Sequence, residues 1–80
     1  MTELPPRADL ELDARGLRCP MPLLKTRQAM RGLLSGQLLC VRTTDVGARR
    51  DIPAWVGQSP HQLVQLEEHG GELVFWVRAG

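Results

Sequence analysis

The sequence predicts an α/β (α+β) fold, a two-layer sandwich in which two helices cover one face of a four-stranded mixed sheet. Three observations support this prediction. Four short segments have the composition or alternation of strands and two have helical spacing, in the order β-α-β-α-β-β. Each predicted strand has one polar face, so the helices need to cover only one side of the sheet. The length, 80 residues, is that of a single domain over residues 1–80.

The first strand is predicted over residues 8–14. Residues 1–7 precede it and are expected to be a disordered lead, because they contain two prolines and no apolar pattern. Leu10 and Leu12 alternate with acidic residues, which is the period of a half-buried strand. Gly16 then permits a sharp turn, so this strand leads directly into the turn before the first helix.

The first helix is predicted over about residues 20–35. Proline is common at the start of a helix and glycine at its end, so Pro20 and Gly36 agree with these bounds. With Ala29 alongside, positions at helical spacing form an apolar face: Leu23, Thr26, Met30, Leu33 and Leu34. The opposite side of this helix holds three polar residues and a glycine: Lys25, Gln28, Arg31 and Gly32.

The second strand is predicted over residues 38–44, which are apolar and β-branched enough for a sheet. A second helix should follow, with Asp45 as a candidate cap. Pro53 lacks an N–H and cannot lie deep inside a helix, so we start this helix near Arg50 or Asp51, after a four-residue loop. Pro53 then falls in the first turn. Apolar residues at helical spacing form the buried side: Ile52, Trp55 and Val56.

The last two strands are predicted at roughly residues 61–68 and 72–78. Between them, Gly70-Gly71 suits the positive backbone angles of a tight hairpin. One face of the final strand is fully apolar: Leu73, Phe75 and Val77. Its other face is mixed: Val74, Trp76 and Arg78.

The charge of the chain excludes some classes of function. Ten Lys and Arg against nine Asp and Glu leave a net charge of +1, which argues against a general polyelectrolyte binder. No apolar run approaches the roughly 18 residues of a membrane span, and the N-terminus lacks a secretion signal, so a cytoplasmic location is expected. Within residues 14–50, however, eight basic residues and one acidic residue leave a local charge of +7.

Cys19 lies at the predicted start of the first helix, in the sequence Cys-Pro-Met-Pro. The unpaired amides and the positive end of a helix dipole favour a thiolate, and so lower the pKa of a cysteine there. Pro20 and Pro22 remove two amides, which leaves those of Met21 and Leu23 as candidate contacts of the sulfur. The residues alone leave two interpretations open, a reactive thiol and a small packing residue at a helix cap.

Other candidate ligands and nucleophiles are interpreted as structural. Cys40 lies in the middle of a predicted strand, and two cysteines cannot form a disulfide framework. Together with His61 and His69 they lack the paired spacings of a zinc site, so no metal is expected. Asp51 is interpreted as a helix cap rather than a catalytic acid. Two alternatives remain, an RNA- or protein-binding module without thiol chemistry and a redox sensor that pairs Cys19 with Cys40.

The segment from Asp13 to Lys25 resembles the signature of the TusA/SirA family of small sulfur carriers, whose motif is Cys-Pro-x-Pro. The resemblance runs from about Asp9 to Arg78 and includes further short matches: Thr44-Asp45, Arg50-Asp51-Ile52-Pro53, His61 and the final Gly-Gly pair. The family fold is a two-layer sandwich of β-α-β-α-β-β order. The resemblance therefore implies the fold that the sequence pattern predicts.

The resemblance also implies that the protein is a sulfur carrier and that Cys19 bears a persulfide. The residues that would support Cys19 are its four successors: Pro20, Met21, Pro22 and Leu23. A donor such as a cysteine desulfurase or a rhodanese-like protein would supply the sulfur, and an acceptor sulfurtransferase would receive it. Such a sulfurtransferase-type carrier needs no cofactor and no metal, and it is not a free-standing turnover enzyme. Direct contact with a membrane or a nucleic acid is not expected.

Basic and polar residues near Cys19 could dock an acidic donor, or they could be a plain solvated face: Arg15, Arg18, Lys25, Gln28 and Arg31. Members of the family serve transfer-RNA thiolation, cofactor maturation or sulfur oxidation. Two positions depart from the family pattern. Val46 stands where the family often has proline, and Met21 stands where carriers for transfer-RNA thiolation often have an acidic residue.

Overall fold

A computed structural model of the protein describes residues 8–80, so the lead predicted for residues 1–7 lies outside the described residues. Six elements follow one another in the described part: β1 (Leu10–Ala14), α1 (Met21–Arg31), β2 (Leu38–Thr43), α2 (Ala48–Gly57), β3 (Gln62–His69) and β4 (Glu72–Arg78). The predicted β-α-β-α-β-β order is confirmed. Neither helix of residues 8–80 is long and apolar enough to cross a membrane.

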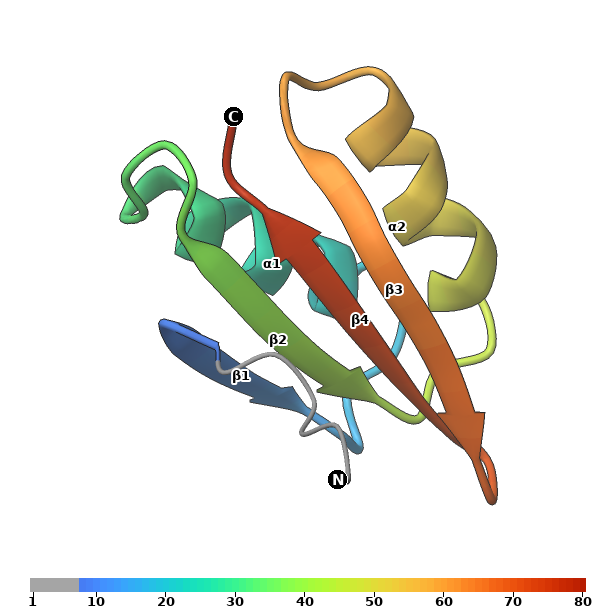
Figure 1. The fold of residues 1–80 in the computed structure, drawn as a ribbon. Helices are drawn as coiled ribbons and strands as arrows, with labels where there is room; N and C mark the ends of the chain where they lie inside the picture. The colour runs from blue at the N-terminus through green and yellow to red at the C-terminus, as the bar shows by residue number, and fades with distance from the viewer. Residues whose placement is uncertain (1–7) are drawn as a thin grey trace, which may run out of the picture.

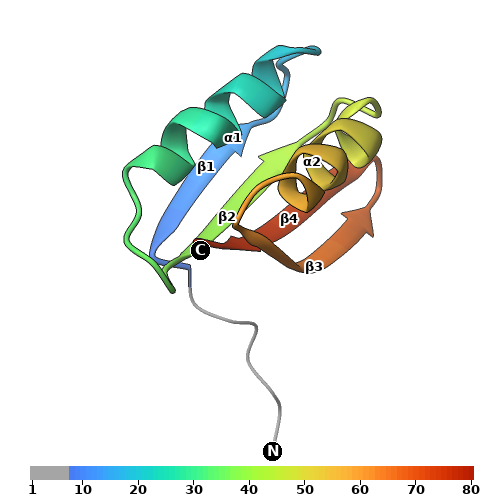
Figure 2. The same cartoon turned by 90° about the horizontal axis from the view of Figure 1, so that it is seen from above.

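The four strands form one mixed sheet with the order β1-β2-β4-β3. β1 and β2 are parallel, whereas β4 is antiparallel to both of its neighbours. Both helices lie on the same face of this sheet, with α1 and α2 side by side (Figures 1 and 2). The predicted two-layer sandwich is therefore confirmed, and within residues 8–80 the second face of its sheet carries no helix.

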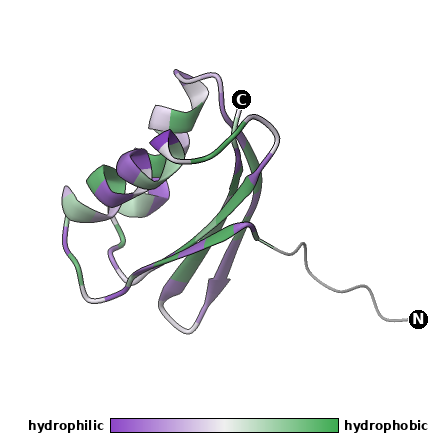
Figure 3. Cartoon of the chain, turned by 90° about the vertical axis from the view of Figure 1, so that its left-hand side faces the viewer, coloured by the Kyte–Doolittle hydropathy of each residue, from purple (hydrophilic) through white to green (hydrophobic). Residues whose placement is uncertain are grey.

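The core lies between the helices and the two central strands. Leu39 and Val41 of β2 and Phe75 and Val77 of β4 are fully buried, and Ile52 of α2 packs among them. The predicted alternation in β4 is confirmed, because its odd-numbered residues belong to this core. Figure 3 shows hydrophobic and hydrophilic positions on both helices, as expected for helices that cover a sheet with one side only.

Helix α1 is shorter than predicted and ends at Arg31, with Gly32 as its C-cap. The Gly32 N–H donates to the Ala29 carbonyl and that of Leu33 donates to the Met30 carbonyl, which tightens the last turn. Beyond Gly32 the chain leaves the helix, so Leu33 still contacts the core but Leu34 is 73% exposed. The prediction that Leu34 belongs to the apolar face is therefore wrong.

Helix α2 begins at Ala48, two residues before the predicted start, and Pro53 lies inside it rather than in its first turn. A proline at this position removes one N–H, whose acceptor would be the Arg49 carbonyl one turn earlier. Arg49 is exposed, so water can bind that carbonyl. The missing backbone hydrogen bond at Pro53 therefore costs less than expected from the sequence, because it lies on the solvent-facing side of a packed helix.

The predicted caps of α2 are also wrong. Its N-cap is Gly47, and no side chain caps the helix, neither Asp45 nor Asp51. Asp51 instead lies in the first turn, where its negative charge interacts favourably with the positive end of the helix dipole. Both carboxylates therefore remain available for contacts outside the helix.

The hairpin between β3 and β4 is confirmed. Gly70 and Gly71 have φ angles of 57° and 86°, a region that favours glycine over other residues. A register shift between Leu63 and Gln65 interrupts the pairing of β3 with β4. β4 pairs with β2, and β3 forms the edge of the sheet opposite β1.

Candidate functional site

Cys19 lies in the loop between β1 and α1 and is exposed. The loop first turns at Gly16, whose φ is 81°. The Gly16 N–H donates to the Thr44 hydroxyl at 2.9 Å, which ties this turn to the loop after β2. Because β1 and β2 are parallel, their C-terminal ends meet at one edge of the sandwich. Cys19 is therefore presented at that edge, on the helix side of the sheet.

The two prolines of the Cys-Pro-Met-Pro motif have different environments. Pro20 is the N-cap of α1 and is exposed, and the peptide bond that joins it to Cys19 is cis. Pro22 is buried, and its carbonyl accepts a hydrogen bond from the hydroxyl of the buried Thr26 at 2.8 Å. The motif thus fixes its second proline in the core, while the cysteine three positions earlier stays at the surface.

The sulfur of Cys19 does not contact the amides that the sequence analysis proposed. The Met21 N–H donates to the Arg18 carbonyl at 2.8 Å, so it is already used. Among residues 8–80, the hydrogen bond of the Cys19 thiol goes to Asp51 Oδ2, with an S–O distance of 3.4 Å. The partner of the sulfur is therefore a carboxylate from the first turn of α2, not the start of α1.

The surroundings of Cys19 stabilise a thiol. The hydrogen bond to Asp51 raises the pKa of Cys19, and partial loss of solvent and the negative charges of Asp51 and Asp45 raise it further. Arg50 acts in the opposite direction, but its Nε also lies 3.5 Å from Asp51 Oδ1. The predicted lowering of the Cys19 pKa is therefore wrong, because the Asp51 carboxylate accepts the hydrogen bond of the thiol and its charge, with that of Asp45, disfavours the thiolate.

The basic excess of residues 14–50 is partly neutralised by carboxylates from other elements. Four of its arginines form ion pairs, with Asp13, Asp51, Glu68 or Glu72: Arg15, Arg42, Arg49 and Arg50. Arg15 Nε lies 2.8 Å from Asp13 Oδ1, and this pair lowers the pKa of Asp13 to about 2. The local charge of +7 is therefore much reduced at the surface.

The predicted docking residues all lie at the surface, but they are not one uniform patch. Arg15 is held by Asp13, whereas Arg18 borders a hollow of about 380 Å³ together with Thr44 and Asp45. Lys25, Gln28 and Arg31 follow the exposed side of α1. Within residues 8–80, Arg18 and the basic residues of α1 have no carboxylate in ion-pair distance. A docking role for these residues stays a prediction.

Cys40 does not share the site with Cys19. It lies in β2 between Leu39 and Val41, which point into the core, so its side chain points to the sheet face without helices. It is only 3% exposed, and this burial raises the pKa of its thiol. Both cysteines are free thiols. The expectation that Cys40 is a packing residue is confirmed.

Sequence reasoning missed the contact between Cys19 and Asp51. The two residues are 32 positions apart, and no local pattern relates them. The one signal for this contact in the sequence was the segment Arg50-Asp51-Ile52-Pro53, which was recognised only as one of the short matches to the TusA/SirA family. The contact arises because β1, β2 and β3 run in the same direction, so the helices that follow β1 and β2 both start at the same edge of the sandwich.

Comparison with known proteins adds independent information. Residues 10–79 match the family model described as sulfurtransferase TusA. The chain is 45% identical over 74 residues to the putative sulfur carrier protein YrkI of Bacillus subtilis (strain 168), which covers 92% of this chain and 99% of that protein. It is 42% identical over 78 residues to the sulfur carrier protein TusA of Pseudomonas putida (strain GB-1), covering 98% and 95%.

A third relative is the sulfur carrier protein TusA of Allochromatium vinosum, which is 39% identical over 70 residues, covering 88% of this chain and 92% of that protein. Among solved structures, a SirA-like protein from Desulfitobacterium hafniense superposes with a TM-score of 0.77, covering 89% of this chain and 97% of that one. Its sequence identity is 24%, so this likeness supports the fold.

Proposed function

Because this chain belongs to the TusA family of sulfur carrier proteins, we propose that Cys19 is the residue on which it carries sulfur, as a persulfide. The chain has two cysteines, and Cys40 is buried on the other side of the sheet. Cys19 is exposed at the edge of the sandwich, where a second protein can reach it. This difference in exposure carries the proposal. Family membership favours a sulfur carrier over the alternative of a binding module without thiol chemistry.

The transfer is an exchange of one sulfur–sulfur bond for another. The Cys19 thiol loses its proton, and the thiolate attacks the terminal sulfur of a persulfide on the donor protein. A bond forms between Cys19 Sγ and that sulfur, while the bond to the donor cysteine breaks and leaves a donor thiolate. No external oxidant or reductant is consumed. The same exchange passes the sulfur from Cys19 to an acceptor thiol and restores the Cys19 thiol.

The contact with Asp51 gives Cys19 a resting state. Because the carboxylate stabilises the S–H form, the sulfur of the free protein is a weak nucleophile at neutral pH. A cationic group of a docked donor beside Asp51 would compete for the carboxylate and favour the thiolate. Activation of Cys19 would then coincide with docking, which protects the thiol from unrelated oxidants and electrophiles between encounters.

The partners of a sulfur carrier are a protein that donates sulfur and a protein that accepts it. For this chain we propose a cysteine desulfurase or a rhodanese-like protein as donor and a sulfurtransferase as acceptor. Docking would use the exposed residues around Cys19 that sequence analysis selected: Arg15, Arg18, Lys25, Gln28 and Arg31. Within residues 8–80, three of these cations form no ion pair, Arg18, Lys25 and Arg31, and such cations favour an acidic surface on the donor.

A cytoplasmic location is part of this proposal. The chemistry requires Cys19 to cycle between a thiol and a persulfide, and a reducing compartment keeps exposed thiols from forming disulfides. The exposed position of Cys19 makes this requirement strict.

Intact-mass spectrometry tests the assignment of Cys19. The protein is incubated with a cysteine desulfurase and free cysteine, and the gain of one sulfur atom is measured. Wild type and Cys40→Ser should gain it, and Cys19→Ser should not. A Cys19→Ser variant that gains as much sulfur as wild type, or a Cys40→Ser variant that gains none, contradicts the proposal. Circular dichroism of each variant checks that the fold is retained.

A further inference from the structure

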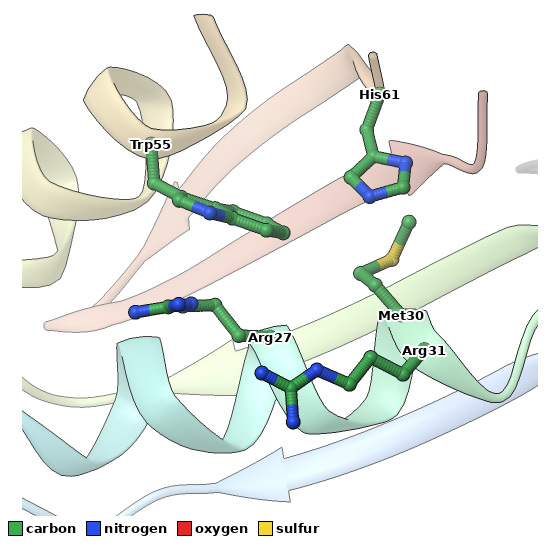
Figure 4. Close-up of a pocket in the computed structure, with 5 residues that line it drawn as sticks. All are labelled: Arg27, Met30, Arg31, Trp55 and His61. Atoms are coloured by element: carbon green, nitrogen blue, oxygen red, sulfur yellow. The ribbon is translucent and has the colours of Figure 1, made fainter. Parts of the chain in front are cut away.

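A second cavity lies between α1 and α2, and Cys19 and Asp51 are not among its lining residues. Its volume is about 330 Å³, and five residues line it: Arg27, Met30, Arg31, Trp55 and His61. Figure 4 shows the two arginines on α1 facing Trp55 of α2 and His61 of the segment before β3. Residues of α1, of α2 and of the segment before β3 thus line one hollow, and Arg31 is the residue that it shares with the proposed docking surface.

A backbone contact determines which nitrogen of the neutral His61 ring carries the proton. The Gly80 N–H donates to His61 Nδ1 at 3.1 Å, so Nδ1 acts as an acceptor. In the neutral ring the proton then sits on Nε2, which makes Nε2–H a donor. Figure 4 shows a ring nitrogen of His61 on the side of Met30, toward α1. His61 can therefore donate a hydrogen bond into the cavity.

The other polar groups that line the cavity are also donors. Arginine and tryptophan side chains contain N–H donors and no acceptor atom, and this applies to Arg27, Arg31 and Trp55. No carboxylate lines the cavity, and within residues 8–80 neither arginine forms an ion pair. A cavity with two fixed positive charges and only donors fits a ligand with two negative charges and only acceptors.

The walls of the cavity add an apolar and aromatic surface. Met30 is 3% exposed and forms the floor on the α1 side. The rings of Trp55 and His61 are 5.4 Å apart between centroids and tilted by 47°, so they present two aromatic surfaces that are not parallel. The volume lies at the lower end of the range of small-molecule sites. A site of this size and lining suits one planar ring beside the negatively charged group of the ligand.

We propose that this cavity binds a phosphate monoester that also contains a planar ring, of the size of a nucleoside monophosphate. A phosphate monoester has a charge near −2 at neutral pH and three acceptor oxygens, which matches two arginines and the His61 donor. A carboxylate has one negative charge and would leave one guanidinium unmatched. The planar ring would contact Trp55, since stacking on an aromatic side chain tolerates any base.

Nuclear magnetic resonance of the full chain tests this proposal with adenosine 5′-monophosphate as the probe. The protein has two tryptophans, so its spectrum contains two indole N–H signals, and Trp76→Phe assigns them. The signal of Trp55 should shift and saturate on titration, while that of Trp76 should not move. Adenosine and inorganic phosphate, each lacking half of the ligand, should bind at least about tenfold more weakly.

Variants identify the cavity as the site. Arg27→Gln and Arg31→Gln should each weaken the binding of adenosine 5′-monophosphate by about tenfold or more, since each removes a charge-assisted hydrogen bond. Lys25→Gln is the matched control, because Lys25 is a cation on the same helix that does not line the cavity, and it should leave the affinity unchanged.

Three results would overturn the proposal. The first is a Trp55 signal that does not shift, and the second is an affinity that the two arginine variants leave intact. The third is equal binding of benzoate, a planar carboxylate, which would remove the preference for phosphate. None of these measurements involves sulfur on Cys19, so they are independent of the proposed carrier chemistry.

Discussion

At the scale of single residues, the contact between Cys19 and Asp51 influences the protonation of the Cys19 sulfur. A carboxylate that accepts the S–H bond stabilises the thiol and opposes the thiolate through its negative charge. Because the pKa of Cys19 is raised, its thiolate fraction at neutral pH is smaller than that of an ordinary cysteine, and its thiolate forms at higher pH. Asp51 therefore controls reactivity without taking part in the bond exchange.

Replacement of Asp51 by asparagine should make Cys19 more reactive. Asp51→Asn removes the negative charge, so the pKa of Cys19 falls and its alkylation by iodoacetamide begins at lower pH. Each unit by which the pKa falls raises the thiolate tenfold but lowers its nucleophilicity, so the net gain in rate is about threefold per unit. The measurement is the alkylation rate of Cys40→Ser protein between neutral and alkaline pH.

Asp13→Asn provides the control for that experiment, because Asp13 pairs with Arg15 and not with Cys19. Its profile should match that of the parent protein. An Asp51→Asn profile that also matches the parent would mean that Asp51 does not set the state of the thiol.

At the scale of elements, local patterns predicted those features of the helices and strands that depend on neighbouring residues. The alternation in β4 and the Gly70-Gly71 turn are examples, because the side of the strand and the sign of φ depend on neighbouring residues only. The ends of the helices were less predictable. The apolar pattern of α1 continues beyond Gly32, although the helix ends at Arg31. Pro53 suggested a later start for α2 than the observed start at Ala48.

Two glycines, one in the β3–β4 turn and one in α2, should respond to alanine in opposite ways. Gly71→Ala should lower the free energy of unfolding by about 1–2 kcal/mol, because φ at this position is 86° and a side chain is strained there. Gly57→Ala should raise it by up to about 1 kcal/mol, because Gly57 lies in α2 with no atom near the position of a new Cβ. Urea unfolding measures both, and equal effects of the two variants would contradict this reasoning.

At the scale of the whole molecule, the net charge of +1 conceals an uneven surface. Carboxylates of β1, β3 and β4 neutralise several arginines, whereas Arg18 and the cations of α1 have no such partner in the described chain. The composition predicted a basic segment, but composition does not determine which of its charges are paired. That depends on strand order and on which loops meet, as does the contact between Cys19 and Asp51.

Sulfur transfer from a donor protein should depend on these unpaired cations. The double variant Arg18→Gln/Lys25→Gln should slow the loading of Cys19 at low salt by roughly tenfold, because long-range attraction increases the rate of encounter. Added salt should reduce the difference between the variant and wild type. Arg49→Gln is the control, since Arg49 is already paired with Glu68. Loading rates that are independent of both salt and these substitutions would show that docking is not electrostatic.

The burial of Cys40 on the sheet face without helices has a consequence for the lifetime of the cargo. A thiol of the same chain that could reach a persulfide on Cys19 would attack its inner sulfur, expel hydrosulfide and leave an intramolecular disulfide. Such a disulfide forms only where the two Cα atoms lie within about 7 Å of each other. The sheet stands between Cys40 and the helix layer that presents Cys19. For sulfur carried on Cys19 as proposed, Cys40 therefore offers no route of loss within the same molecule, and transfer to a thiol requires a second molecule.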